Sequence, residues 1–205
     1  MAIRIAGQDV LLLAQKAVFL VETRSLLIAD MHIGKAMHFR KSGMAMPTGS
    51  DSRDLKLLSK LIVEYSAAEV IFLGDLFHSL ENTSWNELAE LLEAHPTVEF
   101  ALVPGNHDRF STRFIQNLSL QLMPDCYEKG PFLLTHAPLF EVPRGSYNFC
   151  GHIHPGVALA GRGRMSFKAP CFWLGESLGV LPAFGELTGL AMVAPKVGDH
   201  VIMVV

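Results

Sequence analysis

Seven side chains of types that bind metal ions come immediately after apolar segments of this 205-residue chain. They are carboxylates, imidazoles and one amide: Asp30, His32, Asp75, Asn106, His136, His152 and His154. If the apolar segments are strands of an open α/β architecture, ligands bind outside their carboxyl ends, and the residues that follow five such strand ends can converge. Oxygen and imidazole donors without a thiolate suit Mn, Fe or Zn. Seven ligands exceed the needs of one open catalytic ion and suit two ions that share a carboxylate and cleave a phosphate ester.

Each of these motifs also has an ordinary structural explanation. Gly-Asp is a common turn pair, and a lone His at a strand end is usually a hydrogen-bonded surface group. The metal hypothesis depends on the recurrence of the same chemistry at every exit, and Gly151-His152-Ile153-His154 is its most specific part. Residues i and i+2 of a strand face the same side. We therefore expect Asp30 with His32, and His152 with His154, to converge as pairs.

Short apolar segments predict the strands that must position these residues. The predicted strands are 10–13, 17–21, 26–29, 70–73, 99–103, 132–134, 146–150 and 201–205. Helices are predicted from Ser50 or Asp51 to Tyr65, from Ser84 to before Pro96, and over 111–118. Ser84 and Glu87 have the spacing of a capping box. Residues 33–50 are polar and glycine-punctuated, which predicts a long surface loop with room for one helical turn.

The order of these elements predicts an α/β fold. Strands come first, strands alternate with helices next, and mostly strands follow, which favours two mixed sheets packed face to face and flanked by helices, an α/β/β/α sandwich. The length suits one domain, and no linker or repeat divides the chain. We therefore expect a single domain over residues 1–205.

Composition excludes several partners. Only 18% of the residues are charged and the formal net charge is -3, which argues against a bulk nucleic-acid coat and against a polybasic membrane binder, although a local basic groove remains compatible. The three cysteines are widely spaced and form no Cys-x-x-Cys, which is typical of reduced thiols in a cytosolic protein. No segment is apolar enough for a signal peptide or a transmembrane helix. These features predict a cytoplasmic location and no membrane association.

The ordered motifs resemble the calcineurin-like metallophosphoesterase superfamily. They are Asp30-x-His32, Gly74-Asp75, Gly105-Asn106-His107-Asp108, His136 and Gly151-His152-x-His154, and they cover most of the chain from about Leu26 to His154. The resemblance implies the metallophosphoesterase fold and two divalent metal ions, Mn²⁺ foremost, with Fe, Zn or Mg as alternatives.

The same resemblance implies a role for each site residue. Two ligand sets follow from it, the first being Asp30, His32, Asp75 and His154, and the second Asp75, Asn106, His136 and His152. Asp75 would bridge the ions, and a metal-bridging hydroxide would attack phosphorus in line. His107 would act as leaving-group acid or transition-state stabiliser, with Asp108 orienting its ring.

Residues near the ligands are candidates for substrate binding. Many superfamily members carry an acidic residue or Asn shortly after Gly-Asp, whereas this chain reads Leu76-Phe77-His78-Ser79, so His78 is a candidate for a substrate or ligand-supporting role. The full candidate set is Lys35, His38, Arg40, His78 and Arg109. A second basic cluster comprises Arg162, Arg164 and Lys168. These cations suit a phosphate backbone, and solvated loop charges explain them equally well.

Further segments are similar to one bacterial subgroup, the ligase-associated DNA-damage-response endonucleases. The segments are 28–35, 38–40, 74–79, 171–175 and 181–185. This resemblance implies DNA as the phosphodiester substrate and DNA-repair proteins as partners, such as a ligase, a helicase or an exonuclease. The alternatives are a small-molecule phosphodiesterase, a nucleotidase or a phosphomonoesterase of the same superfamily, and a non-catalytic scaffold, against which His107 argues. The sequence does not predict the oligomeric state.

Overall fold

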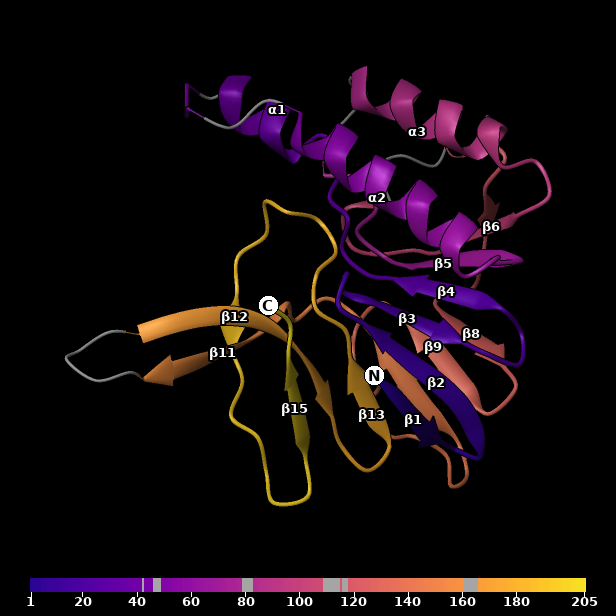
Figure 1. Ribbon diagram of the computed structural model, residues 1–205, viewed down its shortest axis with the longest axis vertical. Coiled ribbons are helices and arrows are strands. Elements are labelled where there is room, and N and C mark those ends of the chain that lie inside the picture. Colours follow the sequence, from indigo (N-terminus) through magenta and orange to yellow (C-terminus); the bar gives the residue numbers. More distant parts are fainter. Residues whose placement is uncertain (42, 46–48, 79–82, 109–114, 116–117, 161–165) are drawn as a thin grey trace.

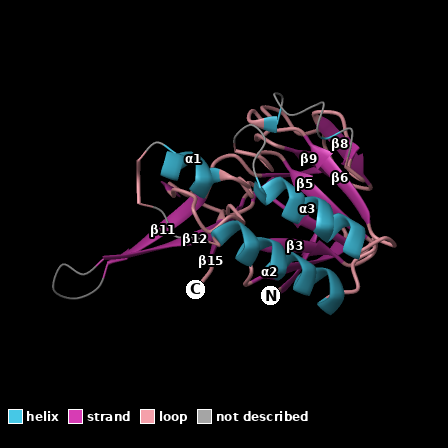
Figure 2. Ribbon diagram, turned by 90° about the horizontal axis from the view of Figure 1, so that it is seen from above, coloured by secondary structure: helices cyan, strands magenta, loops and turns pink. Residues whose placement is uncertain are grey.

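The computed structural model has two mixed β-sheets packed face to face with helices outside, which confirms the predicted α/β fold class (Figures 1 and 2). It describes residues 1–41, 43–45, 49–78, 83–108, 115, 118–160 and 166–205. Within this part of the chain, the helices are α1 (Lys35–Lys41), α2 (Ser50–Glu64) and α3 (Thr83–Ala94). All of them precede the second sheet in the sequence.

The first sheet has seven strands in chain order. They are β1 (Ala2–Ile5), β2 (Gln8–Leu13), β3 (Ala17–Leu20), β4 (Ser25–Ile28), β5 (Glu69–Leu73), β6 (Glu99–Val103) and β7 (Gln121–Leu122). Strands β1 to β4 run antiparallel to one another, and β4 to β7 run parallel. Parallel pairing brings the carboxyl ends of β4, β5 and β6 to the same edge of the sheet.

The second sheet has eight strands. Its order is β14 (Ala191–Met192), β11 (Pro155–Ala160), β12 (Ser166–Leu174), β13 (Leu178–Val180), β10 (Tyr147–Cys150), β9 (Phe132–Thr135) and β8 (Cys126–Lys129), and β15 (His200–Met203) also pairs with β12. Strands β9 and β10 are parallel. Their carboxyl ends therefore also meet at one edge.

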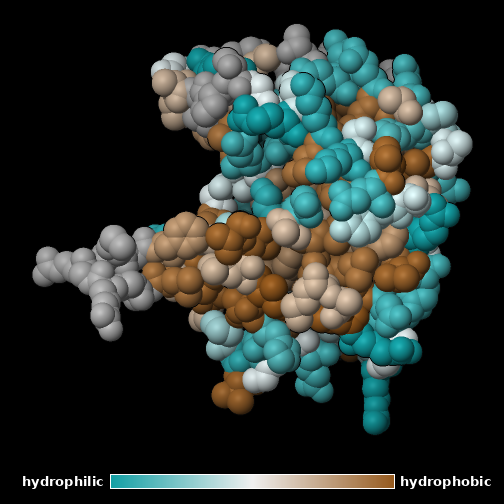
Figure 3. All heavy atoms as spheres, in the orientation of Figure 1, coloured by the Kyte–Doolittle hydropathy of each residue, from teal (hydrophilic) through white to brown (hydrophobic). Residues whose placement is uncertain are grey.

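Burial of both faces explains why the central strands read as continuous apolar runs. In β4, Leu26 packs into the core beneath α2 and α3, whereas Leu27 packs into the core between the sheets. In β5, Val70 and Ile71 divide in the same way. Apolar side chains are also exposed on the second sheet around β11 and β12, among them Leu159 and Phe167 (Figure 3).

Three local predictions are corrected. Strand β1 was not predicted, because its Ala-Ile-Arg-Ile sequence is too short and mixed to stand out. Residues 35–41 form α1 rather than a loop. Helix α2 begins after Gly49, which has a φ of 75°, and no side chain caps it, so neither Ser50 nor Asp51 has the predicted role.

The predicted capping box at α3 is also wrong. The helix begins at Thr83, so Ser84 already lies inside it. The Ser84 hydroxyl donates to Asp51 Oδ2 at 2.6 Å, and Glu87 accepts a hydrogen bond from Ser52. Both residues of the pattern therefore connect α3 to α2 instead of closing the helix end. The short helix predicted over 111–118 lies mostly outside the described residues.

In their described part, residues 156–205 contain strands and connections only, which agrees with the mostly-strand order predicted for the end of the chain. No helix in the described residues is long and apolar enough to cross a membrane.

Candidate metal centre

Two groups of side chains gather at the shared edge of the two sheets. The first cluster is Asp30, His32 and His154, and the second cluster is Asp75, His136 and His152. Within each cluster the candidate donor atoms all lie within 4.8 Å of one another. These residues follow β4, β5, β9 and β10 or precede β11. The structure thus brings together six of the seven predicted ligands in the predicted allocation.

Asp75 lies between the two clusters. Its Oδ2 is 4.0 Å from His32 Nε2 in the first cluster, and its Oδ1 is 3.6 Å from His136 Nε2 in the second. The carboxylate therefore directs one oxygen toward each group, which is the arrangement that a bridging ligand needs.

The donor atoms have the chemistry of a metal site. Asp30 Oδ1 is buried and has no hydrogen-bond donor, although it lies 3.4 Å from His154 Nε2. Burying a carboxylate oxygen without a partner is unfavourable, and a cation would remove that penalty. His32 Nε2 lies 3.4 Å from His154 Nε2, and His136 Nε2 lies 3.0 Å from His152 Nδ1. Imidazole nitrogens that face one another in this way can direct their lone pairs at a shared ion.

Neighbouring groups set the orientation of one of these imidazoles and the protonation state of another. His136 Nδ1 lies 3.0 Å from the Leu73 carbonyl oxygen, so Nδ1–H donates to it and the Nε2 lone pair is left for an ion. Burial, together with the Lys35 charge and the nearby imidazoles, lowers the pKa of His32 to about 2. His32 is therefore neutral at physiological pH, which is the form that binds metals.

Five of the six cluster residues have a left-handed backbone. Their φ angles are 51° at Asp30 and His32, 47° at Asp75, 68° at His152 and 52° at His154. Non-glycine residues adopt this region rarely, and each such residue costs about 1–3 kcal/mol. Such conformations persist only where the surrounding structure holds them, and they concentrate at functional sites.

These angles correct the predicted reason for convergence. Asp30 and His32 do share a cluster, but they meet through a left-handed turn beyond β4 and not as i and i+2 of a strand. His152 and His154 do not form a pair at all, because each belongs to a different cluster.

The glycines before three ligands leave room for carboxylates and rings. A methyl group at Gly105 would overlap the Asp75 carboxylate, and one at Gly151 would overlap the Asp30 carboxylate. A methyl group at Gly74 would overlap the His136 ring. The glycines in the Gly-Asp, Gly-Asn and Gly-His motifs are thus required by close packing at the centre.

Asn106 and His107 lie beside the clusters. Asn106 lines a hollow of about 250 Å³ together with His136 and Thr135, next to the second cluster. The His107 amide donates to Asp75 Oδ1 at 3.0 Å, and its ring is exposed. The ring centroid lies 5.6 Å from that of His32. His107 is therefore next to the centre and open to a substrate.

Asp108 is bonded differently from the prediction. Its Oδ2 accepts from the Gly105 amide at 2.8 Å, and its Oδ1 accepts from the Phe77 amide at 3.1 Å. The carboxylate therefore ties the turn after β6 to the segment after β5, where the prediction had it orienting the His107 ring. Burial raises the pKa of Asp108 to about 6, opposed by these two backbone hydrogen bonds.

The predicted substrate-binding residues in the described part of the chain are Lys35, His38, Arg40 and His78. Lys35, His38 and Arg40 are on α1. The His78 ring is stacked on His107 with centroids 5.1 Å apart, and it contacts the His38 ring edge-on at 5.4 Å. Burial lowers the pKa of His78 to about 4, and the Lys35 charge contributes. His78 thus connects α1 to the His107 turn. Phe39 packs against the same ring.

The basic residues on loops are only partly described. Arg109, Arg162 and Arg164 lie outside the described residues, and Lys168 is exposed on β12.

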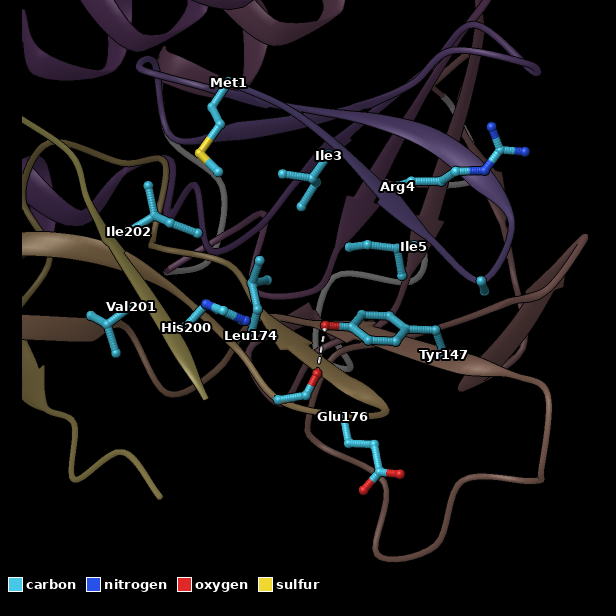
Figure 4. Close-up of a pocket in the computed structure, with 12 residues that line it drawn as sticks. Met1, Ile3, Arg4, Ile5, Tyr147, Leu174, Glu176, His200, Val201 and Ile202 are labelled. Carbon is cyan, nitrogen blue, oxygen red and sulfur yellow. Dashed lines mark hydrogen bonds between the residues drawn. The ribbon is translucent and has the colours of Figure 1, made fainter. Parts of the chain in front are cut away.

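A separate cavity of about 460 Å³ lies between β1 and the end of β12, lined by Ile3, Tyr147 and Ile202 among others (Figure 4). It contains none of the predicted site residues.

Comparison with known proteins identifies similar sequences and folds. Residues 23–156 match the family described as calcineurin-like phosphoesterase. The crystal structure of Pseudomonas putida nuclease MPE is 30% identical and covers 100% of this chain and 96% of that one, with a TM-score of 0.85. The Escherichia coli phosphoesterase YfcE is 16% identical over 78% of this chain and 79% of that chain, with a TM-score of 0.44. The comparison with curated proteins gave no match.

Proposed function

The chain belongs to the calcineurin-like phosphoesterase family and is a metal-dependent phosphoesterase, and from this premise we propose that it hydrolyses phosphodiester bonds of DNA as an endonuclease. The observation that supports a two-ion reaction is the position of Asp75, with one carboxylate oxygen toward each donor cluster. Asp30, His32, Asp75 and His154 would hold the first ion. Asp75, Asn106, His136 and His152 would hold the second.

Divalent ions bound there would lower the pKa of a water nucleophile and neutralise charge on the phosphate oxygens. The clusters supply no thiolate, and their mixture of carboxylate and imidazole suits Mn, Fe or Zn. Following the family resemblance, Mn²⁺ is the ion in this proposal, with Fe, Zn and Mg as alternatives. Burial keeps His32 neutral, and Asp30 retains an oxygen without a hydrogen-bond partner. Both side chains are therefore already in the form that binds a metal before the ion is present.

His107 is the residue that we assign to the leaving group. Its ring is exposed beside the first cluster, while its amide is fixed by Asp75. From that position the imidazole can donate a proton or a hydrogen bond to the departing oxygen. Asp108 supports the reaction through the backbone of the same turn.

The α1 side of the centre is the proposed substrate side. Lys35 offers a cation to a phosphate, and burial lowers its pKa while Asp30 and Asp75 oppose that shift. His38, Arg40 and His78 extend this surface, and Arg109 stays in the proposal although it is not among the described residues. The rings of His38, Phe39 and His78 form a group on which a base or sugar can pack.

The DNA substrate is supported by similarity to a nuclease over the full chain. A net charge of -3 means that any grip on DNA must be local. The role in DNA repair, the partner proteins and the cytoplasmic location stay predictions from the sequence.

Circular single-stranded DNA provides the test, because only an endonuclease can open it. The metal-free protein is incubated with Mn²⁺, Mg²⁺ or Zn²⁺ and with DNA, bis-nitrophenyl phosphate, nitrophenyl phosphate or a nucleotide panel. We expect Mn²⁺-dependent cleavage of the circle and of the diester. The Asp75→Asn variant should be inactive, which excludes a contaminating nuclease. Turnover of nucleotides or monoesters with the circle left intact would favour the small-molecule alternatives instead.

Metal content provides the second measurement. Elemental analysis after loading and desalting should give two ions per chain. One ion per chain in an active enzyme would contradict the two-ion mechanism and leave the family assignment in place.

A further inference from the structure

The turn Asp30-Met31-His32 carries two ligands of the proposed first ion and needs support from outside. Two of its three residues have left-handed φ angles of 51°. A chain free to relax would leave this conformation, because each such residue costs about 1–3 kcal/mol. That this turn presents metal ligands rests on the proposed function, whereas the way the turn is held follows from contacts in the structure.

One side of the turn is held by the segment after β5. The Asp30 amide donates to the Gly74 carbonyl at 3.2 Å, and the His32 amide donates to the Asp75 carbonyl at 2.9 Å. These bonds connect the two clusters to each other. They leave the carbonyl side of the turn to be held by another part of the chain.

The other side is held by residues from the C-terminal quarter. The Phe184 amide donates to the Ala29 carbonyl at 2.8 Å, and the Gly185 amide donates to the Asp30 carbonyl at 3.3 Å. A methyl group at Gly185 would overlap the Met31 carbonyl oxygen. Only glycine lets this segment approach the turn so closely.

This segment is itself anchored at several points. Lys16 Nζ donates to the Phe184 carbonyl at 2.5 Å, and the Glu186 amide donates to Asp54 Oδ2 on α2 at 3.0 Å. Arg53 Nη2 on the same helix donates to Glu186 Oε2 at 2.6 Å. The Phe184 side chain is fully buried in the core beneath the helices. The segment is therefore fixed to both α2 and the β2–β3 turn.

We propose that residues 184–186, the brace, are positioning residues that hold Asp30-Met31-His32 in the conformation that presents the first metal site. The segment 181–185 stood out in the sequence, and the predicted metal chemistry gave it no role. Its position behind the turn gives it one. The brace contacts no substrate, so it acts on the reaction only through Asp30 and His32.

Amide hydrogen exchange of the metal-free protein tests the brace directly. The Gly185→Ala variant should exchange the amides of Asp30 and His32 at least about ten-fold faster, because the methyl group pushes the brace away from the Met31 carbonyl. Gly189→Ala is the matched control, since Gly189 has open space around its Cα and lies three residues beyond the brace. Lys16→Met is a milder variant that removes the bond to the Phe184 carbonyl and the Lys16 charge near Asp54 and Glu186, and it should show a smaller acceleration.

General destabilisation must be separated from this local effect. Leu88→Ala removes a fully buried side chain from α3 and lowers the stability of the same helix-side core without touching the brace. In this variant, the exchange rate of the Asp30 and His32 amides divided by the rate of global opening should equal that of the wild type. Acceleration equal to that in Gly185→Ala would overturn the proposal.

Mn²⁺ binding gives a readout at the site itself. Gly185→Ala should weaken the first ion about 10–100-fold, the range seen for residues that support ligands, and leave the second ion bound. The paramagnetic resonance spectrum should then change from that of a coupled ion pair to that of a single ion. Two ions bound with unchanged affinity, or unchanged exchange in both Gly185→Ala and Lys16→Met, would refute the brace. A wild-type protein that binds no ion would refute the proposed function, and the exchange data would still decide how the turn is held.

Discussion

At the scale of single residues, the centre depends on side chains whose protonation and orientation are fixed before any ion arrives. Burial keeps His32 neutral, and the Leu73 carbonyl sets the tautomer of His136. Asp30 keeps one oxygen without a donor. The unpartnered Asp30 oxygen is unfavourable in a protein without a cation, and a bound cation would use it together with the two neutral imidazoles.

The role proposed for His107 allows catalysis to be tested separately from metal binding. The His107→Ala variant should bind two ions as the wild type does, because the ring is no member of either cluster. Its turnover of bis-nitrophenyl phosphate should fall about 10²–10⁴-fold, the usual contribution of a general acid. Elemental analysis and the rate are measured on the same preparation. Full activity in this variant would show that the leaving group needs no help from His107.

Asp108 should matter for stability as well as for rate. Asp108→Ala leaves the Gly105 and Phe77 amides without their acceptor, and each unpaired buried amide costs about 1–3 kcal/mol. The melting temperature should fall by several degrees, with about 2–4 °C expected per kcal/mol. Glu90→Ala, on the exposed side of α3, is the control. Lost activity with an unchanged melting temperature would favour the original idea that Asp108 orients the His107 ring.

At the scale of elements, side chains near the starts of α2 and α3 connect the helices to each other and to the loop before α1. Asp51 Oδ2 accepts from both the Ser84 hydroxyl and the Gly34 amide. Gly34 directly precedes α1, which carries Lys35 and His38. A polar pattern that looks like a helix cap in the sequence therefore positions the proposed substrate side.

A double-mutant cycle tests this connection. Ser84→Ala and Asp51→Asn should each lower the free energy of unfolding, and the double variant should lose less than their sum. A coupling of about 0.5–3 kcal/mol is expected for residues in contact. Urea denaturation of the four proteins provides the measurement. Additive effects would indicate that Ser84 acts on α3 alone, as a cap would.

At the scale of the whole molecule, a buried charged group links folding to pH. Burial raises the pKa of Asp54 to about 6, opposed by its bond from the Glu186 amide and by Lys16, and supported by the charges of Glu186 and Asp51. The folded state therefore holds this proton more tightly than the unfolded state, where the pKa is near 4. Stability from Asp54 is fully present below about pH 4 and is lost as the pH rises through about 6.

The Asp54→Asn variant should not show that loss. The difference between the melting temperatures of the wild type and the variant should decline from pH 4 to pH 7. A pKa shift of this direction and size predicts a decline of several degrees. The difference is needed because His32 and His78 have lowered pKa values and act in the opposite direction as the pH falls below about 6.5. Calorimetry of the metal-free proteins at matched ionic strength measures it. A difference that is constant with pH would mean that Asp54 is not strained by burial.

Much of the fold could be predicted because apolar runs are local features. Strands β5 and β6 were predicted within one residue, since both of their faces are buried and the sequence reads as continuous Val, Ile, Leu and Phe. Strand β1 and helix α1 could not be predicted. Both are short: β1 has four residues of mixed polarity, and a helix as short as α1 depends on packing against the rest of the fold.

The sequence by itself determined which side chains could form the centre, because ligands need the right chemistry and strand ends are recognisable from hydrophobicity. Only the tertiary structure decided that Asp30 and His32 meet through a left-handed turn, that Asp108 holds backbone amides, and that residues 184–186 lie against the turn at Asp30. The physical reason is that these outcomes depend on left-handed backbone angles and on contacts between segments that are far apart in the sequence, by 31 residues for Asp108 with Phe77 and by more than 100 for the brace with the turn. Neither leaves a periodic or local pattern in the amino-acid sequence.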